Sequence, residues 1–278
     1  MFNKVLLVMS LTDKTDRMLD ALYSICSNPA TEVWLLHVME DAAQANPNGA
    51  YYKRVKHRLE DYAREIRNAG YDHVQVLLHR HLNVTNDVQD TVDELDIDFV
   101  IMGSHDRGFL EGTFRGSNVF NAVRNVDVPT LIVKGDYDCK DFLRRVLLPT
   151  DFSRASLNAL RILRNLREQV GEVIFVHVIE DPRDRDIRED REVAEDMLEE
   201  LQTEMQDFGI RARYEIVRGH AASHEVCRIA EEEDCSLIFT GETGLSPVRG
   251  MLRHSTAQNI VLHATRALWI IPDEDSDD

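Results

Sequence analysis

Short apolar runs rich in Val, Ile and Leu alternate along the chain with longer segments of helical periodicity. Runs that are apolar at nearly every position are typical of strands buried on both faces, as in parallel sheets covered by helices. The pattern predicts strands at residues 4–9, 32–38, 73–80, 97–102, 128–134, 145–150, 172–178, 211–217, 236–240 and 267–271. It predicts helices at residues 13–26, 50–69, 84–95, 117–125, 153–168, 188–208, 221–233 and 255–264. This alternation indicates an α/β protein.

The second half of the chain repeats the first at an offset of 138 to 141 residues. "KVLLVMSLTDKT" at residue 4 corresponds to "RVLLPTDFSRAS" at 145, and "EVWLLHVMED" at 32 corresponds to "EVIFVHVIED" at 172. A nearly constant offset through a chain indicates one duplicated domain. We expect two α/β domains, at residues 1–137 and 143–273, with a linker in the segment "GDYDCKDF".

Composition narrows the range of functions. Fifty acidic and 32 basic residues give a net charge of −18, which argues against a general nucleic-acid-binding protein because phosphates require a basic surface. The four cysteines have no C-x-x-C spacing, so reduced thiols are expected. No apolar run approaches the length of a membrane helix, and the first residues are typical of a buried strand, so we expect a cytoplasmic protein. Whether the acidity marks a halophilic source stays open.

Two glycine-containing loops are candidate phosphate sites. "GSHDRGFLEGTFRGSN" begins at residue 103 and "GETGLSPVRGMLRHST" at residue 241, each after the fourth predicted strand of its half. In open parallel sheets ligands bind beyond the carboxyl ends of strands, where glycine backbone and a following helix N-terminus offer N–H donors. Ser117 and Ser255 stand where those helices are expected to begin. The alternative is that both are ordinary strand-to-helix loops with serine caps.

Taken together, these features resemble the universal stress protein family. The resemblance covers both halves and rests on the pattern G-x-x-G-x9-G-[ST], on "HVIE" at the end of a second strand, and above all on "VLLPTDFSRASLNAL". It implies two tandem open five-stranded parallel sheets with strand order 3-2-1-4-5 and helices on both faces, an adenine nucleotide alpha hydrolase-like fold. It also implies an intramolecular pairing of the two halves through their fifth strands, and leaves a homodimer open.

In the second half the resemblance implies a nearly complete site for ATP, with magnesium as the accompanying ion. The residues that match the adenine and ribose positions of the family are Pro149, Thr150, Asp151 and Val178. Those that match its phosphate loop are Gly241, Gly244, Ser255 and Thr256. His254 stands where the family has a third glycine, and together with Arg249 and Arg253 it makes this loop basic. The imidazole of His254 either contacts an anion or fills the space that the anion needs.

In the first half the resemblance implies a degenerate site. Ser10 replaces the aspartate of the ribose position, which removes a hydrogen-bond acceptor. Asp106 replaces the second glycine, and its carboxylate would repel a phosphate by several kcal/mol at contact distance. The residues that still match the family pattern are Val38, Gly103, Gly116, Ser117 and Asn118.

Several histidines invite other interpretations. His79 with His81, and His220 with His224, have spacings at which a pair can hold a metal, but no carboxylate or cysteine at a convincing spacing completes either site, so no metal site is predicted. His37 and its counterpart in the second half each end a second strand, and this repetition predicts a structural role.

Two classes of function follow from the sequence and the resemblance. The first is a stress-response protein that binds ATP or another adenine nucleotide in its second domain and acts as a nucleotide-dependent regulatory or interaction module. The alternative is a universal stress protein that binds protein or lipid-like partners and no nucleotide. No adjacent nucleophile and base are evident, so the sequence does not require an enzyme, although slow ATP hydrolysis stays open.

Overall fold

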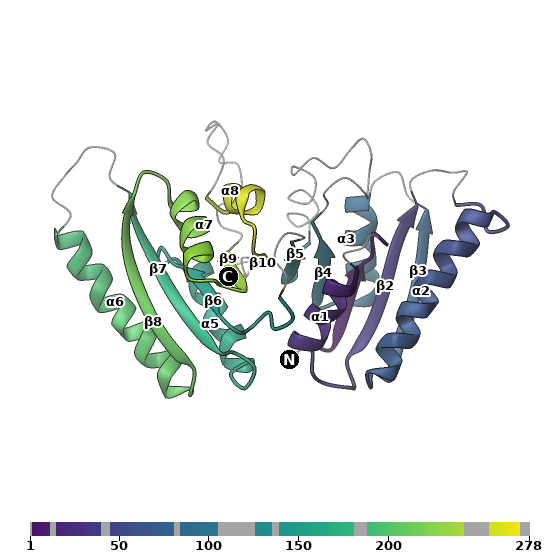
Figure 1. Ribbon diagram of the computed structural model, residues 1–278, viewed down its shortest axis with the longest axis horizontal. Helices are drawn as coiled ribbons and strands as arrows, with labels where there is room; N and C mark the ends of the chain where they lie inside the picture. The colour runs from purple at the N-terminus through teal and green to yellow at the C-terminus, as the bar shows by residue number, and fades with distance from the viewer. Residues whose placement is uncertain are drawn as a thin grey trace. The chain divides into compact units, whose positions relative to one another are not determined.

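The computed structural model describes residues 2–11, 15–39, 45–80, 84–104, 126–134, 139–180, 188–241 and 256–272. The chain forms two compact units, Met1–Gly135 and Asp136–Asp278 (Figure 1). Each unit contains one parallel sheet with helices, so the predicted duplicated α/β fold is confirmed. The predicted helix at residues 117–125 lies outside the described residues.

In the first unit the strands lie in the order β3-β2-β1-β4-β5, and all neighbouring strands are parallel. The strands are β1 (Lys4–Val8), β2 (Glu32–Met39), β3 (His73–Arg80), β4 (Phe99–Gly103) and β5 (Thr130–Val133). The helices are α1 (Thr15–Ile25), α2 (Ala50–Asn68) and α3 (Val84–Leu95). Nearly all residues of β1, β4 and β5 are buried, which is the reason for their continuous apolar sequence.

The second unit repeats this order as β8-β7-β6-β9-β10, again with parallel neighbours. The strands are β6 (Val146–Pro149), β7 (Glu172–Glu180), β8 (Arg211–Gly219), β9 (Leu237–Gly241) and β10 (Ala267–Ile271). The helices are α5 (Arg154–Asn165), α6 (Arg188–Asp207), α7 (Ala222–Glu232) and α8 (Thr256–His263). Parallel crossovers are right-handed, so α5 and α6 cover one face of this sheet while α7 and α8, which contact each other, cover the opposite face.

The helices α2 and α6 occupy the same place in the two units and match residue by residue at an offset of 139. Their shared buried positions are Val55, Leu59 and Ile66 in α2 and Ala194, Leu198 and Met205 in α6. Both are followed by a glycine with positive φ, Gly70 at 107° and Gly209 at 80°. Only glycine adopts this conformation without strain, so each helix ends at the same point before its next strand.

Part of the predicted linker belongs to the core of the second unit. Cys139 and Phe142 are 8% and 3% exposed. Ser236, which is completely buried, donates its hydroxyl to the Phe142 carbonyl (3.0 Å) and accepts the backbone N–H of Arg145 (3.0 Å). These hydrogen bonds fix the chain as it enters β6.

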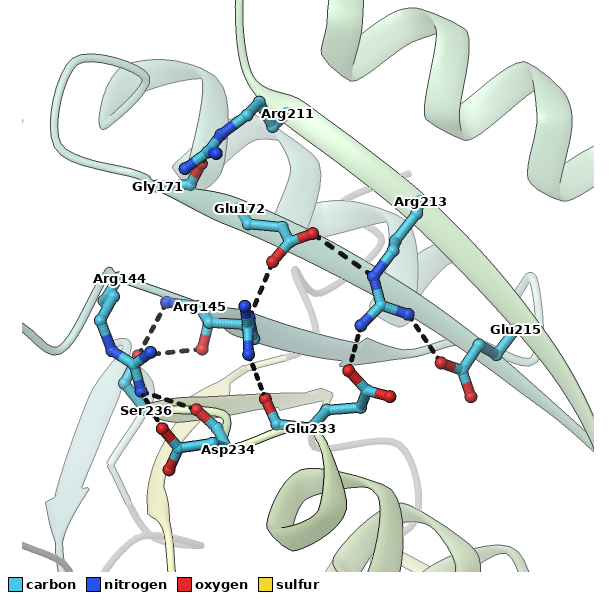
Figure 2. A network of polar contacts seen from close by, with 10 residues as sticks. All are labelled: Arg144, Arg145, Gly171, Glu172, Arg211, Arg213, Glu215, Glu233, Asp234 and Ser236. Atoms are coloured by element: carbon cyan, nitrogen blue, oxygen red, sulfur yellow. Dashed lines mark hydrogen bonds and ion pairs between the residues drawn. The ribbon is translucent and has the colours of Figure 1, made fainter.

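A network of ion pairs joins the amino-terminal ends of three strands in the second unit (Figure 2). Arg145, just before β6, pairs with Glu172, the first residue of β7, with 2.7 Å between Nε and Oε2. The second oxygen of Glu172 lies 3.3 Å from Nε of Arg213 on β8. Arg213 also pairs with Glu215 and Glu233. The network therefore holds β6, β7 and β8 in register at the edge opposite to their carboxyl ends.

Candidate functional site

A cavity of about 340 Å³ lies in the second unit, where the carboxyl ends of β6, β7 and β9 meet the first turns of α7 and α8. The chain leaves β6 toward β7 on one side and returns through β9 on the other, so this is the point at which the strand order reverses. Loops on the two sides of a switch point diverge and leave a crevice, which is where open α/β sheets bind ligands. A volume of this size accommodates a small organic molecule.

Residues 149 to 153 form the floor of the cavity as the chain turns from β6 into α5. Thr150 is buried, accepts the Phe152 N–H at its hydroxyl (3.0 Å) and donates its own N–H to the Val176 carbonyl (2.9 Å). Asp151 is exposed, and its Oδ1 accepts the Ser153 N–H (3.0 Å). Side chains that bond backbone two residues ahead stabilise a turn. The Asp151 carboxylate is thereby held at the cavity.

His177 anchors this turn from β7. Its Nδ1 lies 2.8 Å from the Thr150 carbonyl, and because a carbonyl only accepts, Nδ1 carries the proton. His37 makes the same bond to the Met9 carbonyl in the first unit, also at 2.8 Å. Burial lowers the pKa of His37, so this imidazole is neutral at pH 7. The repeated histidines therefore have the structural role that their repetition predicts.

The walls of the cavity are apolar and the floor is polar. The apolar lining residues include Val176 and Val178 of β7, Val226 of α7 and Ile260 of α8. The remaining lining residues are Pro149, Thr150, Asp151, Ser153, His177, Ala222, Thr240, Gly241, Thr256 and Ala257. Apolar walls suit a flat ring system, while the carboxylate and hydroxyls can bond hydroxyl or amino groups of the same ligand.

A side chain from another element, Glu180 of β7, caps the first turn of α7. Ala221 precedes α7 and offers no side-chain cap, but the carboxylate of Glu180, at the end of β7, accepts the Ala222 N–H at 2.5 Å. This negative charge lies at the positive end of the α7 dipole. An anionic group of a ligand is therefore not expected at the N-terminus of α7.

Six of the residues assigned to the nucleotide site by resemblance line this one cavity: Pro149, Thr150, Asp151, Val178, Gly241 and Thr256. The others, Gly244, Arg253, His254 and Ser255, lie outside the described residues, as does Arg249. The sequence interpretation missed the wall residues of α7 and α8. The sequence carried no signal for them, because apolar residues such as Val226 and Ile260 follow the same pattern on any buried helix face.

In the first unit, Ser10, Val38 and Gly103 stand at the carboxyl ends of β1, β2 and β4. Asp106, Gly116, Ser117 and Asn118 lie outside the described residues. Arg58 of α2 reaches this edge and donates to the Leu11 carbonyl (2.7 Å). In the second unit Met197 stands at the position that matches Arg58, so this cation is present only in the first unit. The carboxyl ends of the two sheets also differ at the residue pair Ser10 and Asp151.

The described residues were compared with the requirements of a metal-binding cluster and of a membrane-spanning helix. No cluster of three or more His, Cys, Asp or Glu side chains suited to a metal occurs among them, and His79 is instead paired with Asp87 (3.1 Å). None of the helices within the described ranges has the length and apolar character needed to cross a bilayer. The cysteines in these ranges are free thiols, and burial raises the pKa of Cys235 to about 12.

Fold and cavity together define a tandem α/β protein whose second unit has a ligand-sized crevice at the switch point of its sheet. The sequence model of the universal stress protein family matches residues 1–134 and 143–272. The chain therefore belongs to the universal stress protein family, with two such domains in tandem.

The chain is also similar to individual proteins. A curated universal stress protein of Methanocaldococcus jannaschii is 24% identical over 158 residues, which is 48% of this chain and 97% of that protein. A solved universal stress protein from Archaeoglobus fulgidus is 19% identical, covers 97% of this chain and 96% of its own, and has a TM-score of 0.70. A universal stress protein solved in complex with cAMP is 20% identical over 47% of this chain and 97% of its own, with a TM-score of 0.40.

Proposed function

We propose that the second domain binds ATP or another adenine nucleotide, with magnesium, and that the chain acts as a nucleotide-dependent regulatory or interaction module. The observation that carries this proposal is the cavity at the carboxyl ends of β6, β7 and β9, because it gathers the adenine and ribose positions of the family resemblance on one apolar-walled crevice. The adenine ring would lie between Val178 and the α7 and α8 walls. The ribose hydroxyls would bond Asp151.

Several features of the site support an adenosine moiety. Hydrogen bonds to Val176 and His177 hold the N–H and the carbonyl of Thr150. The backbone at Thr150 is therefore preorganised to contact a planar base. The Asp151 carboxylate is exposed and therefore able to accept from two adjacent hydroxyls. The phosphates would extend toward the segment 242–255, away from the carboxylate of Glu180 at α7.

Calorimetric titration of the full-length chain with ATP and Mg²⁺ tests the proposal. We expect one site per chain, with binding weakened about tenfold or more in Asp151→Ala, because two hydrogen bonds to ribose are lost. The matched control is Ser10→Ala, at the same position of the first domain, which should leave the affinity unchanged. A His254→Gly variant is titrated alongside, and cyclic AMP is compared as a second ligand.

The outcomes separate the alternatives. Equal weakening by Ser10→Ala and Asp151→Ala would place the binding in both domains. Binding only in the His254→Gly variant would show that this histidine fills the phosphate space. Absence of binding by both the unmodified chain and this variant would refute the nucleotide proposal and favour a universal stress protein that binds only other partners.

The proposal includes pairing of the two domains through β5 and β10. Each of these strands comes last in the strand order of its own unit, and the main-chain N–H and C=O groups at such an edge favour addition of a further strand. Inserting a protease cleavage sequence after Gly135 and cutting it tests this pairing. The halves should elute together in size-exclusion chromatography, whereas separate elution would contradict it, and the eluted mass also reports whether two chains associate.

A further inference from the structure

The solvent face of α6 differs from that of its counterpart α2 in a way that solvation alone does not explain. α6 contains nine acidic and two basic residues, whereas α2 contains three acidic and six basic ones. At three matched positions of the register, carboxylates stand in α6 where α2 has lysine or histidine. The matched pairs are Lys53 with Glu192, Lys56 with Glu195, and His57 with Asp196.

The same face of α6 exposes apolar side chains. Val193 is 56% exposed and Met197 is 38% exposed, and the two lie one helical turn apart. Their matched residues in α2 are Arg54 and Arg58, each of which lies over a tyrosine ring of its own helix. Of the five large apolar side chains that are exposed among the described residues, these two and Phe208 lie on or directly after α6.

An acidic surface by itself is explained by hydration and solubility, but exposed apolar groups are not. Val193 and Met197 stand at positions where a charged residue is compatible with the helix, as α2 demonstrates. Glu192, Asp196 and Glu200, all exposed, lie next to them or about one turn away in the helix sequence. Apolar side chains next to several like charges form a surface that a partner of opposite charge can cover.

We propose that the α6 face around Val193 and Met197 is a docking surface for a basic amphipathic segment of another protein. The partner would present two apolar side chains one turn apart, flanked by lysine or arginine, as in helix recognition through i and i+4 contacts. A second copy of this chain is disfavoured as the partner because two molecules of charge −18 repel each other. The proposal does not depend on nucleotide binding.

Fluorescence anisotropy with labelled synthetic helical peptides tests the docking surface on the full-length chain. The probe carries two leucines one turn apart among lysines. One comparison peptide has serines in place of the leucines, and another has glutamates in place of the lysines. We expect binding of the leucine and lysine peptide to be about tenfold or more tighter than that of the serine peptide, because only the former buries apolar surface. The glutamate peptide should not bind.

The protein variants place the interaction on α6. Val193→Arg with Met197→Arg transfers the α2 residues to α6 and should weaken binding about tenfold or more, since apolar contact is replaced by repulsion. The matched control, Leu157→Arg with Leu262→Arg, adds the same charge at two exposed apolar positions of α5 and α8. It should change the affinity by less than about twofold. A Val193→Ser and Met197→Ser variant, with unchanged charge, should also lose binding.

Four results would overturn the proposal. Equal weakening by the control pair, or equal binding of the serine peptide, would show that the attraction is diffuse and electrostatic. Unchanged binding in both α6 variants would place the site elsewhere. Concentration-dependent self-association in sedimentation velocity that Val193→Arg with Met197→Arg abolishes would identify a second copy, through its basic α2, as the occupant.

Discussion

The ring of Phe152 stacks on the imidazole of His177, with 4.7 Å between the ring centroids and 29° between their planes. Phe152 reaches this position in the left-handed region, with φ of 62°, directly after the Asp151 turn. Leu11, at the same place in the first unit, has φ of 58°. Both domains therefore hold a side chain in a strained backbone conformation where the first strand passes toward its helix, beside the residues assigned to the ligand.

Strain at Phe152 is measurable by comparing two substitutions. Phe152→Ala and Phe152→Gly both remove the stacked ring, but only glycine adopts this φ without a steric penalty. We expect the glycine variant to be more stable than the alanine variant by about 1 kcal/mol in urea unfolding. The same comparison at Leu11 serves as the matched control and should have the same sign. Greater stability of the alanine variant at both positions would contradict the left-handed conformation.

Gly171 lies where no side chain fits. A Cβ at this position would be 2.3 Å from the carbonyl oxygen of Arg144, and the Gly171 N–H bonds the Leu143 carbonyl at 2.9 Å. Backbone cannot yield as a flexible side chain does, so Gly171→Ala should lower the free energy of unfolding by about 2 kcal/mol or more. Gly103→Ala is the control, since its Cβ would meet only Met18 at an ordinary 3.7 Å. Similar losses for both variants would show that the approach to Arg144 is not limiting.

Loss of a residue from the ion-pair network of the second domain should cost more stability than loss of an exposed ion pair. Arg145 bridges the Glu172 carboxylate and the Glu233 carbonyl and is 31% exposed, so Arg145→Met leaves partly buried acceptors unpaired. We expect a loss of about 2 kcal/mol in the free energy of unfolding. Arg64→Met in α2 breaks an exposed pair with Asp61 and should cost less than about 0.5 kcal/mol. Equal losses of stability in the two variants would show that the ion pairs drawn in Figure 2 do not stabilise one another.

The His79 and Asp87 pair predicts a pH dependence of stability in the first domain. The hydrogen bond to Asp87 raises the pKa of His79 above its ordinary value of 6.5, while burial opposes the shift. A base with a raised pKa stabilises the fold fully below that ordinary value and loses the contribution as the pH rises through the raised pKa. His79→Gln should therefore destabilise the protein more at about pH 5.5 than at about pH 8.5.

Urea unfolding of both proteins at the two pH values measures this difference. His37, whose pKa burial lowers, contributes in the opposite direction and is present in both proteins, so it cancels in the comparison. Asp87→Asn should abolish the pH-dependent part of the His79 effect. A His79→Gln cost that is independent of pH would show that the pair is not charged in the folded state.

Much of the fold was predictable from the sequence because its causes are local and periodic. The strands of the sheet centres, such as β1 and β9, are apolar at almost every position, and they lie within two residues of their predicted bounds. The repeat offset identified two domains before any contact was known. The resemblance then supplied the strand order, which the structure confirms in each domain.

The candidate site was predictable where its residues match the family pattern at strand ends and at the start of α8. Pro149, Thr150 and Asp151 close β6 in a recognisable sequence, but Val226 and Ile260 reach the same cavity from α7 and α8. Nothing in the local sequence tells a wall of a crevice from an ordinary buried helix face. The role of Glu180 in capping α7 was equally hidden, since its partner lies 42 residues away in the chain.

The sequence alone determined the class of fold, the duplication and the residue types at the strand ends, because hydrophobic periodicity and strand-terminal polar residues are properties of neighbouring positions. Tertiary structure alone decided which residues share a cavity and which charges meet. Crossover connections bring β6, β7 and β9 together from distant parts of the chain, so the 340 Å³ crevice and the left-handed Phe152 against His177 exist only once the sheet has formed.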